Sequence, residues 1–266
     1  MTVLYSFYSS AGIVFAADRR LTARVPQMVR GKRITSQFYS EDDPKILRGP
    51  IGVHHDGGLI GYFGHALAGK TPMHDWLAEF CANWSGSREP RTFCAGLVEA
   101  LKAAGHPWTK EVTGFHIGAF VTRGGRETPT FWFVRNGQIS PATAGYHVFN
   151  EPHWAIEELL TDRDFLGLSP RQLQDALRLR ETQIGVPYWY SNGDLSAFAH
   201  VRDSLERAAA VMIRQPGYKA PANLDDWTRV AEAFVVAAIS LADATFKKGA
   251  PRIGGVADAL TLSWGT

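Results

Sequence analysis

Cysteine is scarce in this sequence. Only Cys81 and Cys94 occur among its 266 residues, and neither has the spacing of a metal site. Both lie in stretches with the residue pattern of helices. This use of cysteine suggests reduced, buried thiols in a cytoplasmic protein.

Long apolar runs, a signal peptide and dense positive charge are missing as well. The longest helical apolar run, residues 233–242, is too short to span a bilayer, and the N-terminus lacks the basic region, apolar segment and cleavage site of a signal peptide. The formal net charge is +2 without a block of Lys and Arg, so nucleic acid is a weak candidate partner. An apolar content of 45% and a charged content of 20% predict an ordinary globular protein that binds neither membrane nor nucleic acid.

The first twenty residues are predicted to form a β-hairpin that brings Thr2 close to charged side chains. Within residues 3–17, an alternating stretch and a short apolar run flank a turn of small residues near Ser10. A hairpin with this centre pairs residues whose numbers sum to about 20 or 21. Thr2 then lies beside Asp18 or Arg19.

A hydroxyl beside a free N-terminus has a chemical use. Threonine is a poor nucleophile at neutral pH and needs an adjacent base. If Met1 is removed, the α-amine of Thr2, with an ordinary pKa of about 7.7–8.0, becomes that base. While Met1 is attached, the Thr2 nitrogen is an amide and cannot accept the proton. The alternative is that Thr2 is only the first residue of a strand, where threonine is common.

The distance from Thr2 to the next charged residues resembles that of a known family. Ala-Ala-Asp-Arg-Arg at residues 16–20, followed by Thr22, matches the start of mature β-type proteasome subunits without a gap. The chain most resembles the small self-assembling bacterial relatives of the proteasome, the Anbu-like and HslV-like proteins. The resemblance implies an N-terminal nucleophile (Ntn) hydrolase: an α+β fold built as a four-layer αββα sandwich, usually assembled into rings. We expect one such domain over residues 1–266.

The resemblance implies roles for three further residues, and the position of Gly64 suggests a role for a fourth. Lys45 begins a predicted strand, as the family's pKa-lowering lysine does, although it comes about ten residues late and Lys32 is a substitute. Asp18 would keep this lysine charged and oriented, and Arg20 would brace the site. The Gly64 N–H, expected between a strand and the start of a helix, would stabilise the oxyanion. The alternatives are a solvated lysine, a structural salt bridge at Asp18 and a simple turn glycine.

The sequence departs from the family pattern at two places. The family carries an aspartate a few residues before its last Gly-Gly pair, and Ala250 stands close to that position here. A Ser-Gly pair normally supports the amine, and its best match is residues 191–194, where Ser191 or Asp194 could serve. Both departures weaken the case for activity more than the case for the fold.

The remaining pattern follows the element order of proteasome-type subunits, with a helical insertion at about residues 140–190. Residues 23–44 are expected to form a loop or an irregular hairpin. The predicted strands are residues 45–53, 59–63, 115–122 and 130–134, and residues 253–262 resemble the family's segment of a Gly-Gly pair followed by a strand. The predicted helices are residues 65–84, 90–104, 152–160, 170–182, 196–213 and 224–248.

These features favour a threonine-type peptidase or amidohydrolase subunit of a self-assembling, proteasome-like particle, ring-shaped or helical, which acts on a peptide or amide without a cofactor. One alternative is a catalytically inactive scaffold or ring subunit; another is a small-molecule amidase on the same fold. The sequence His-His-Asp at residues 54–56 has turn character and lacks a third ligand at a recognisable spacing, so we expect no metal. The substrate, the ring size and any ATPase partner are not legible in the sequence.

Overall fold

The computed structural model describes residues 2–29, 32–40, 42–140, 145–160, 168–193, 204–205, 207–245 and 254–264. Its strands are β1 (Val3–Ser9), β2 (Gly12–Asp18), β3 (Leu21–Val29), β4 (Lys32–Ser40), β5 (Ile46–Gly49), β6 (Gly58–Gly64), β7 (Leu67–Ala68), β8 (Thr71–Pro72), β9 (Thr113–Arg123), β10 (Arg126–Arg135), β11 (Gly137–Ser140), β12 (Gly145–Val148), β13 (Ala155–Glu158), β14 (Tyr188–Gly193) and β15 (Ala257–Ser263). Its helices are α1 (Met73–Ala82), α2 (Pro90–Ala103), α3 (Pro170–Ile184) and α5 (Leu224–Thr245).

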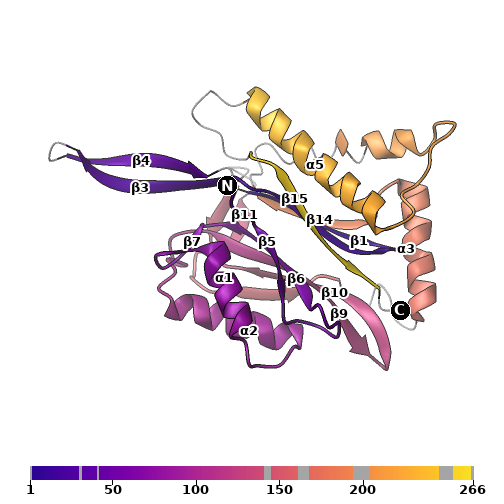
Figure 1. Cartoon of the computed structure of the whole chain (residues 1–266), viewed down its shortest axis with the longest axis horizontal. Helices are drawn as coiled ribbons and strands as arrows, with labels where there is room; N and C mark the ends of the chain where they lie inside the picture. Colours follow the sequence, from indigo (N-terminus) through magenta and orange to yellow (C-terminus); the bar gives the residue numbers. More distant parts are fainter. Residues whose placement is uncertain are drawn as a thin grey trace.

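Two sheets form the body of the structure (Figure 1). One has four strands in the order β14-β1-β2-β15, and the other has five strands in the order β13-β10-β9-β6-β5. Every strand pair within them is antiparallel. The expectation of a mixed fold of helices and antiparallel sheets is therefore confirmed.

Three apolar clusters hold the sheets and helices together. The first packs α1 and α2 against the five-stranded sheet, the second lies between the two sheets, and the third packs α5 against the four-stranded sheet. Full burial of one such aliphatic or aromatic side chain contributes roughly 1.5–3 kcal/mol. Representative members are Leu77, Phe93 and Ile117 in the first cluster, Leu4, Phe15 and Phe131 in the second, and Phe7, Trp227 and Val235 in the third.

The N-terminal hairpin has the predicted register. Leu4 pairs with Ala17, so that the numbers of paired residues sum to 21. Continuing this register past the end of the ladder sets Thr2 opposite Arg19, one of the two predicted partners. Both strands are buried along their whole length, because the inter-sheet cluster covers one face and α5 covers the other.

The helix predicted over residues 65–84 is wrong in its first half. α1 begins only at Met73, because β7 and β8 form a short hairpin ahead of it. Gly69 in the turn of this hairpin has a φ of +60°, a conformation that glycine adopts without the steric cost of a Cβ. Pro72, directly before the helix, has no backbone N–H to donate to a preceding turn.

The insertion predicted over residues 140–190 is only partly helical. Residues 170–182 lie in α3, which begins after Ser169 with a capping box and with Pro170 in its first turn, as predicted. Residues 152–160, in contrast, contain strand β13, which pairs with β10 at the edge of the five-stranded sheet. An existing sheet edge supplies the backbone hydrogen bonds that a short helix would have to form alone.

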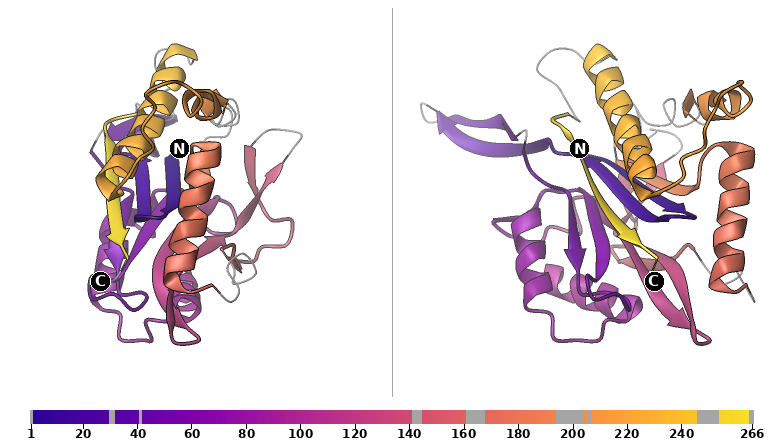
Figure 2. Two further views of the ribbon diagram at one scale, coloured as in Figure 1. Left: turned by 90° about the vertical axis from the view of Figure 1, so that its right-hand side faces the viewer. Right: turned by 45° about the vertical axis from the view of Figure 1, so that its right-hand side comes forward.

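Residues 23–44 form a more regular structure than expected. β3 and β4 pair along their whole length as a two-stranded ribbon, which extends away from the two sheets in Figures 1 and 2. The sequence of β4 contains Ile34, Thr35, Phe38 and Tyr39, which belong to the residue types enriched in strands.

The strand predicted over residues 45–53 is too long, because β5 ends at Gly49 and the next residue, Pro50, has no N–H for a strand ladder. Most of the other predicted elements correspond closely to observed ones, as far as the described residues extend. Residues 90–104 correspond to α2, residues 115–122 and 130–134 lie within β9 and β10, and residues 224–248 correspond to α5, whose last three predicted residues lie outside the described part. Of the helix predicted over residues 196–213, the described residues 204–205 and 207–212 are helical. No helix in the described part is long and apolar enough to cross a membrane.

A buried polar contact joins the two sheets. His116 of β9 lies between Ser6 and Asn192, with 2.7 Å from its Nδ1 to the serine Oγ and 2.5 Å from its Nε2 to the asparagine Nδ2. Because the amide nitrogen donates to Nε2, the proton of the neutral ring lies on Nδ1 and points toward Ser6. His116 is therefore not placed as a base for the Ser6 hydroxyl. Burial among aromatic rings lowers the pKa of His116 to about 3.

We predict that this contact makes the fold sensitive to acid. The unfolded chain takes up the His116 proton near the ordinary pKa of 6.5, whereas the folded chain takes it up only near pH 3. Between these values the unfolded state binds more protons. As the pH is lowered from 6.5 toward 3, His116 should therefore decrease the free energy of unfolding by about 1.4 kcal/mol per pH unit. Urea unfolding at several pH values should show a shallower dependence for His116→Gln than for wild type.

The control for this experiment is His55→Gln, because the side chain of His55 is fully exposed. This variant should retain the pH dependence of the wild type. An equally steep dependence in His116→Gln would show that His116 does not carry the acid sensitivity.

Candidate active site

Asp18 connects the end of β2 to the start of the chain. Its Oδ1 accepts a hydrogen bond from the Val3 N–H at 2.7 Å, so the carboxylate lies against the peptide bond that follows Thr2. Asp18 has no exposed surface, and Thr2 is 4% exposed. The hairpin register thus brings together the two residues that the sequence spacing singled out.

Lys45 lies directly before β5 and reaches the same carboxylate. Its Nζ is 2.9 Å from Asp18 Oδ1 and donates to the backbone carbonyl of Arg20 at 2.6 Å. Only 1% of Lys45 is exposed, so the alternative of a solvated surface lysine is wrong. Burial lowers the pKa of Lys45, and the Asp18 carboxylate opposes this shift.

The position of Lys45 in the sequence has a structural explanation. The β3–β4 ribbon lies between the N-terminal hairpin and β5, and it accounts for the additional residues before this lysine. Lys32, the substitute considered from sequence, is the first residue of β4 and pairs with Val29 next to the tip of the ribbon. Asp43 closes the base of the ribbon by donating its N–H to the Arg19 carbonyl at 2.9 Å. The lysine that contacts Asp18 is Lys45.

Arg20 contacts the site through its backbone and its side chain. Its carbonyl accepts the hydrogen bond from Lys45, and its own N–H donates to the Gly254 carbonyl at 3.1 Å. Its Nη1 lies 4.0 Å from Asp243 Oδ1 in α5. These contacts fit a residue that braces the site.

Gly64 does not lie where the sequence analysis expected it. It is the last residue of β6, pairs with Thr113 of β9 and precedes the first residue of α1, Met73, by nine positions. The expected position at the N-terminal end of a helix is therefore wrong, and a helix dipole does not act on its N–H. Gly64 nevertheless lies near the segment that carries Lys45. The N–H of Tyr62, two residues before Gly64 in β6, donates to the Lys45 carbonyl at 3.0 Å.

The residues considered as supports for the amine are only partly described. The register of β1 with β14 pairs Ser191 with Tyr5, three residues or about 10 Å along the strand from Thr2. Ser191 is therefore not the neighbour of Thr2. Asp194 and Ala250 lie outside the described residues.

Within the described part of the chain, no group of three or more His, Cys, Asp or Glu side chains is placed to hold a metal ion. His54 lies with its Nε2 3.1 Å from Glu127 Oε1, which gives it a structural partner. Cys81 and Cys94 are free, the first half-buried and the second buried. Burial raises the pKa of both thiols, that of Cys81 to about 12.

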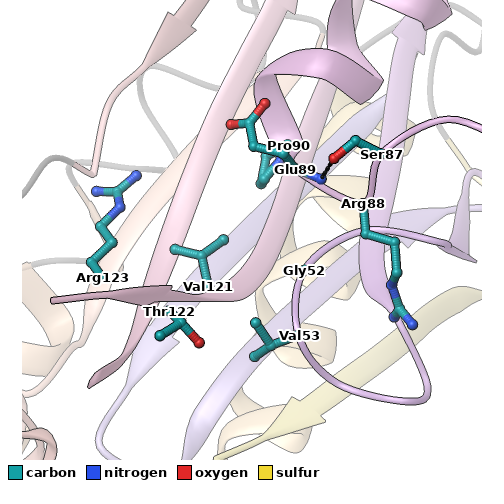
Figure 3. Close-up of a pocket in the computed structure, with 9 residues that line it drawn as sticks. All are labelled: Gly52, Val53, Ser87, Arg88, Glu89, Pro90, Val121, Thr122 and Arg123. Atoms are coloured by element: carbon teal, nitrogen blue, oxygen red, sulfur yellow. Dashed lines mark hydrogen bonds between the residues drawn. The ribbon is translucent and has the colours of Figure 1, made fainter. Parts of the chain in front are cut away.

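A cavity of 340 Å³ is lined by none of the five candidate residues (Figure 3). The end of β9 that lines it is about eight residues, or about 26 Å, from Thr113, the partner of Gly64. The acidic residue in its lining, Glu89, already caps α2 by accepting from two backbone N–H groups. This cavity is therefore not a substrate site for Thr2. Its lining residues are Gly52, Val53, Ser87, Arg88, Glu89, Pro90, Val121, Thr122 and Arg123.

One contact of the site was not predicted from the sequence. The Gly254 N–H donates to Asp18 Oδ2 at 3.2 Å, across 236 positions of the chain. The Gly-Gly pair at residues 254–255 was visible as the segment before the last predicted strand. The spacing of this pair in the sequence does not indicate that the Gly254 N–H contacts Asp18, because this contact depends on the pairing of β15 with β2.

We predict that Lys45 and Asp18 are strongly coupled in stability. Removing one partner of a buried ion pair leaves an uncompensated charge or dipole and costs about 3–5 kcal/mol. Lys45→Met and Asp18→Asn should each lower the free energy of unfolding by about this amount, and the double variant should lose clearly less than the sum. Chemical unfolding of the four proteins gives the coupling energy directly.

The exposed pair of Lys102 and Glu99, at 2.8 Å in α2, provides the control. Lys102→Met should change the free energy of unfolding by less than about 1 kcal/mol, because water screens an exposed pair. Additive losses in the Lys45–Asp18 cycle would contradict the coupling.

Comparison with known proteins leaves the family of the chain open. No family model and no curated protein matches it. Among solved structures, it is similar to an Anbu (Gly-1) mutant from Hyphomicrobium sp. strain MC1, with a TM-score of 0.44 and 12% identity over 99% of this chain and 82% of that chain. A likeness at this TM-score does not assign the chain to a family.

Proposed function

We propose that this chain is a threonine-type peptidase or amidohydrolase subunit of a self-assembling, proteasome-like particle, with Thr2 as its nucleophile after removal of Met1. The observation that carries the proposal is the buried Lys45–Asp18 pair, whose carboxylate also accepts the N–H of Val3, the residue after Thr2. The proposal includes one Ntn-hydrolase domain over the whole chain, located in the cytoplasm. It requires no cofactor.

A buried ion pair is a costly feature that favours a functional role. Desolvation of two charges can exceed their mutual attraction, so a pair such as Lys45 and Asp18 adds little to stability over an apolar replacement. Buried groups with shifted pKa values and a specific charged partner are common at catalytic sites. The placement of such a pair beside a threonine at the start of a strand supports the assignment.

The arrangement of layers supports the same fold assignment. α5 covers one sheet, α1 and α2 cover the other, and an apolar cluster fills the space between the sheets. Figures 1 and 2 show these elements in the same relation from three directions. We take this arrangement as the four-layer αββα sandwich that the Ntn-hydrolase hypothesis requires.

In the proposed reaction, the Thr2 Oγ attacks the carbonyl carbon of a peptide or amide, and its proton passes to the Thr2 α-amine. The Gly64 N–H donates to the oxygen that becomes negatively charged. The α-amine then gives the proton to the leaving nitrogen, which departs as an amine and leaves an ester on Thr2. Water, losing a proton to the same α-amine, hydrolyses the ester and restores Thr2.

The charged residues tune this reaction without forming bonds to the substrate. The Lys45 ammonium lowers the pKa of the nearby nucleophile, because a positive charge favours the alkoxide over the hydroxyl. Asp18 favours the charged form of Lys45, and Arg20 braces the segment that connects them. Assembly with further copies, and an ATPase partner of unknown kind, belong to the proposal only as expectations from the resemblance.

Intact-protein mass spectrometry with an epoxyketone probe tests the proposal. The probe reacts with both the hydroxyl and the free α-amine of an N-terminal threonine, so an adduct requires the loss of Met1. We expect wild-type protein to lack Met1 and to carry one adduct. Thr2→Ala should carry none, whereas the control Thr71→Ala, at an exposed threonine of β8, should be labelled like the wild type.

Retention of Met1 together with the absence of an adduct would contradict the proposal and favour the inactive scaffold subunit. Native mass spectrometry separates the two active alternatives. A ring or larger assembly is expected for the proteasome-like subunit, whereas an active monomer would indicate a small-molecule amidase.

A further inference from the structure

The Asp18 carboxylate is held at both of its oxygens. Oδ1 accepts from the Val3 N–H and from Lys45, as described above, and Oδ2 accepts from the Gly254 N–H at 3.2 Å. The third donor comes from the segment before β15, and Gly254 is itself buried. The orientation of the carboxylate therefore depends on a residue near the other end of the described chain.

The contacts around Asp18 close into a ring of four residues. Asp18 binds Lys45, Lys45 donates to the Arg20 carbonyl, and the Arg20 N–H donates to the Gly254 carbonyl at 3.1 Å. The Gly254 N–H completes the ring by returning to Asp18. Each residue is fixed by two neighbours, so a displacement of one is transmitted to the others.

The Arg20 guanidinium packs so close to Gly254 that a side chain at this position requires a displacement. A Cβ on Gly254 would lie 2.2 Å from Arg20 Cζ and 2.5 Å from its Nη1, far inside contact distance. The guanidinium therefore packs directly against the glycine backbone. Any larger residue at this position has to displace either the arginine or the N–H that binds Asp18.

We propose that Gly254 and Arg20 are positioning residues that together set the geometry of the Lys45–Asp18 pair relative to Thr2. This inference rests on the proposed function, because it concerns the reactivity of the same site. Gly254 acts through its N–H and through the space left by its missing side chain. Arg20 acts through its carbonyl on Lys45 and through its guanidinium on Gly254.

The physical consequence concerns the charge beside the nucleophile. If the Gly254 N–H moves away, Asp18 Oδ2 loses its donor in a buried environment, and the carboxylate is free to rotate. Lys45 then shifts with it, because it is bound to the same carboxylate. A misplacement of a catalytic group by about 1 Å can cost about 100-fold in rate.

The test measures the rate of epoxyketone acylation as a function of pH in wild type and Gly254→Ala. We expect a rate about 10- to 100-fold lower in the variant, with a displaced pH profile. Gly124→Ala is the matched control, since Gly124 also has a positive φ of +55° but nothing lies within 4 Å of an added Cβ. The added methyl group strains only the β9–β10 turn, which is not part of the site. The acylation profile of Gly124→Ala should therefore match that of the wild type.

A double-mutant cycle tests the steric part of the proposal. Arg20→Ala removes the group that the new methyl would meet, so Gly254→Ala should cost less in the Arg20→Ala background than in wild type. Thermal unfolding of each variant identifies any that fails to fold. Equal losses in both backgrounds would overturn the role assigned to the guanidinium.

A measurement independent of activity separates this inference from the proposed function. The pKa of Lys45, followed by NMR of its ε-carbon, should differ between wild type and Gly254→Ala but not between wild type and Gly124→Ala. If wild-type protein forms no adduct, the proposed function fails and the lysine titration still decides whether Gly254 positions the pair. An unchanged lysine titration, or an unchanged acylation profile where acylation occurs, would overturn the inference.

Discussion

The interaction on which the site depends is the buried ion pair between Lys45 and Asp18, at 2.9 Å. Two charges removed from water attract each other strongly, but their desolvation can exceed that attraction unless further hydrogen bonds satisfy them. The structure supplies these bonds from the Val3 and Gly254 N–H groups and from the Arg20 carbonyl. The pair is thus sustained by backbone groups of three separate segments.

The fold brings those segments together by strand pairing. β2 carries Asp18 and lies between β1 and β15, so that Val3 of β1 and Gly254 in the segment before β15 each bring a backbone N–H to its carboxylate. β5 belongs to the other sheet, and the Lys45 ammonium crosses from it to the first sheet. His116 makes a further polar contact between the two sheets, where its neighbours are aromatic rings. The two sheets are thus joined by the charged contact at the site and by further polar contacts, among them those of His116.

The parts of the site that could be predicted from sequence are those that local pairing determines. The turn near Ser10 sets the hairpin register, and the register sets the approach of Thr2 to Asp18. The burial of Lys45 and the hydrogen bond from Gly254 to Asp18 depend on contacts between distant segments. The periodicity of apolar residues and the spacing of motif residues do not predict such contacts. The same limit explains the strand at residues 155–158, because a sheet edge rather than local propensity decides its conformation. The prediction of a helix directly after Gly64 was wrong for a local reason, because the turn around Gly69 precedes the helix.

The central claim is that the Lys45–Asp18 pair serves a nucleophile at Thr2, and a crystal structure of the probe-treated protein tests it most directly. The account predicts a covalent bond from Thr2 Oγ1 to the probe, with the former carbonyl oxygen about 2.7–3.1 Å from the Gly64 nitrogen, the distance expected for an oxyanion donor. It also predicts that Lys45 and Asp18 stay paired beneath the adduct. An intact threonine with the probe bound elsewhere, or a Thr2 side chain out of reach of Lys45, would contradict it.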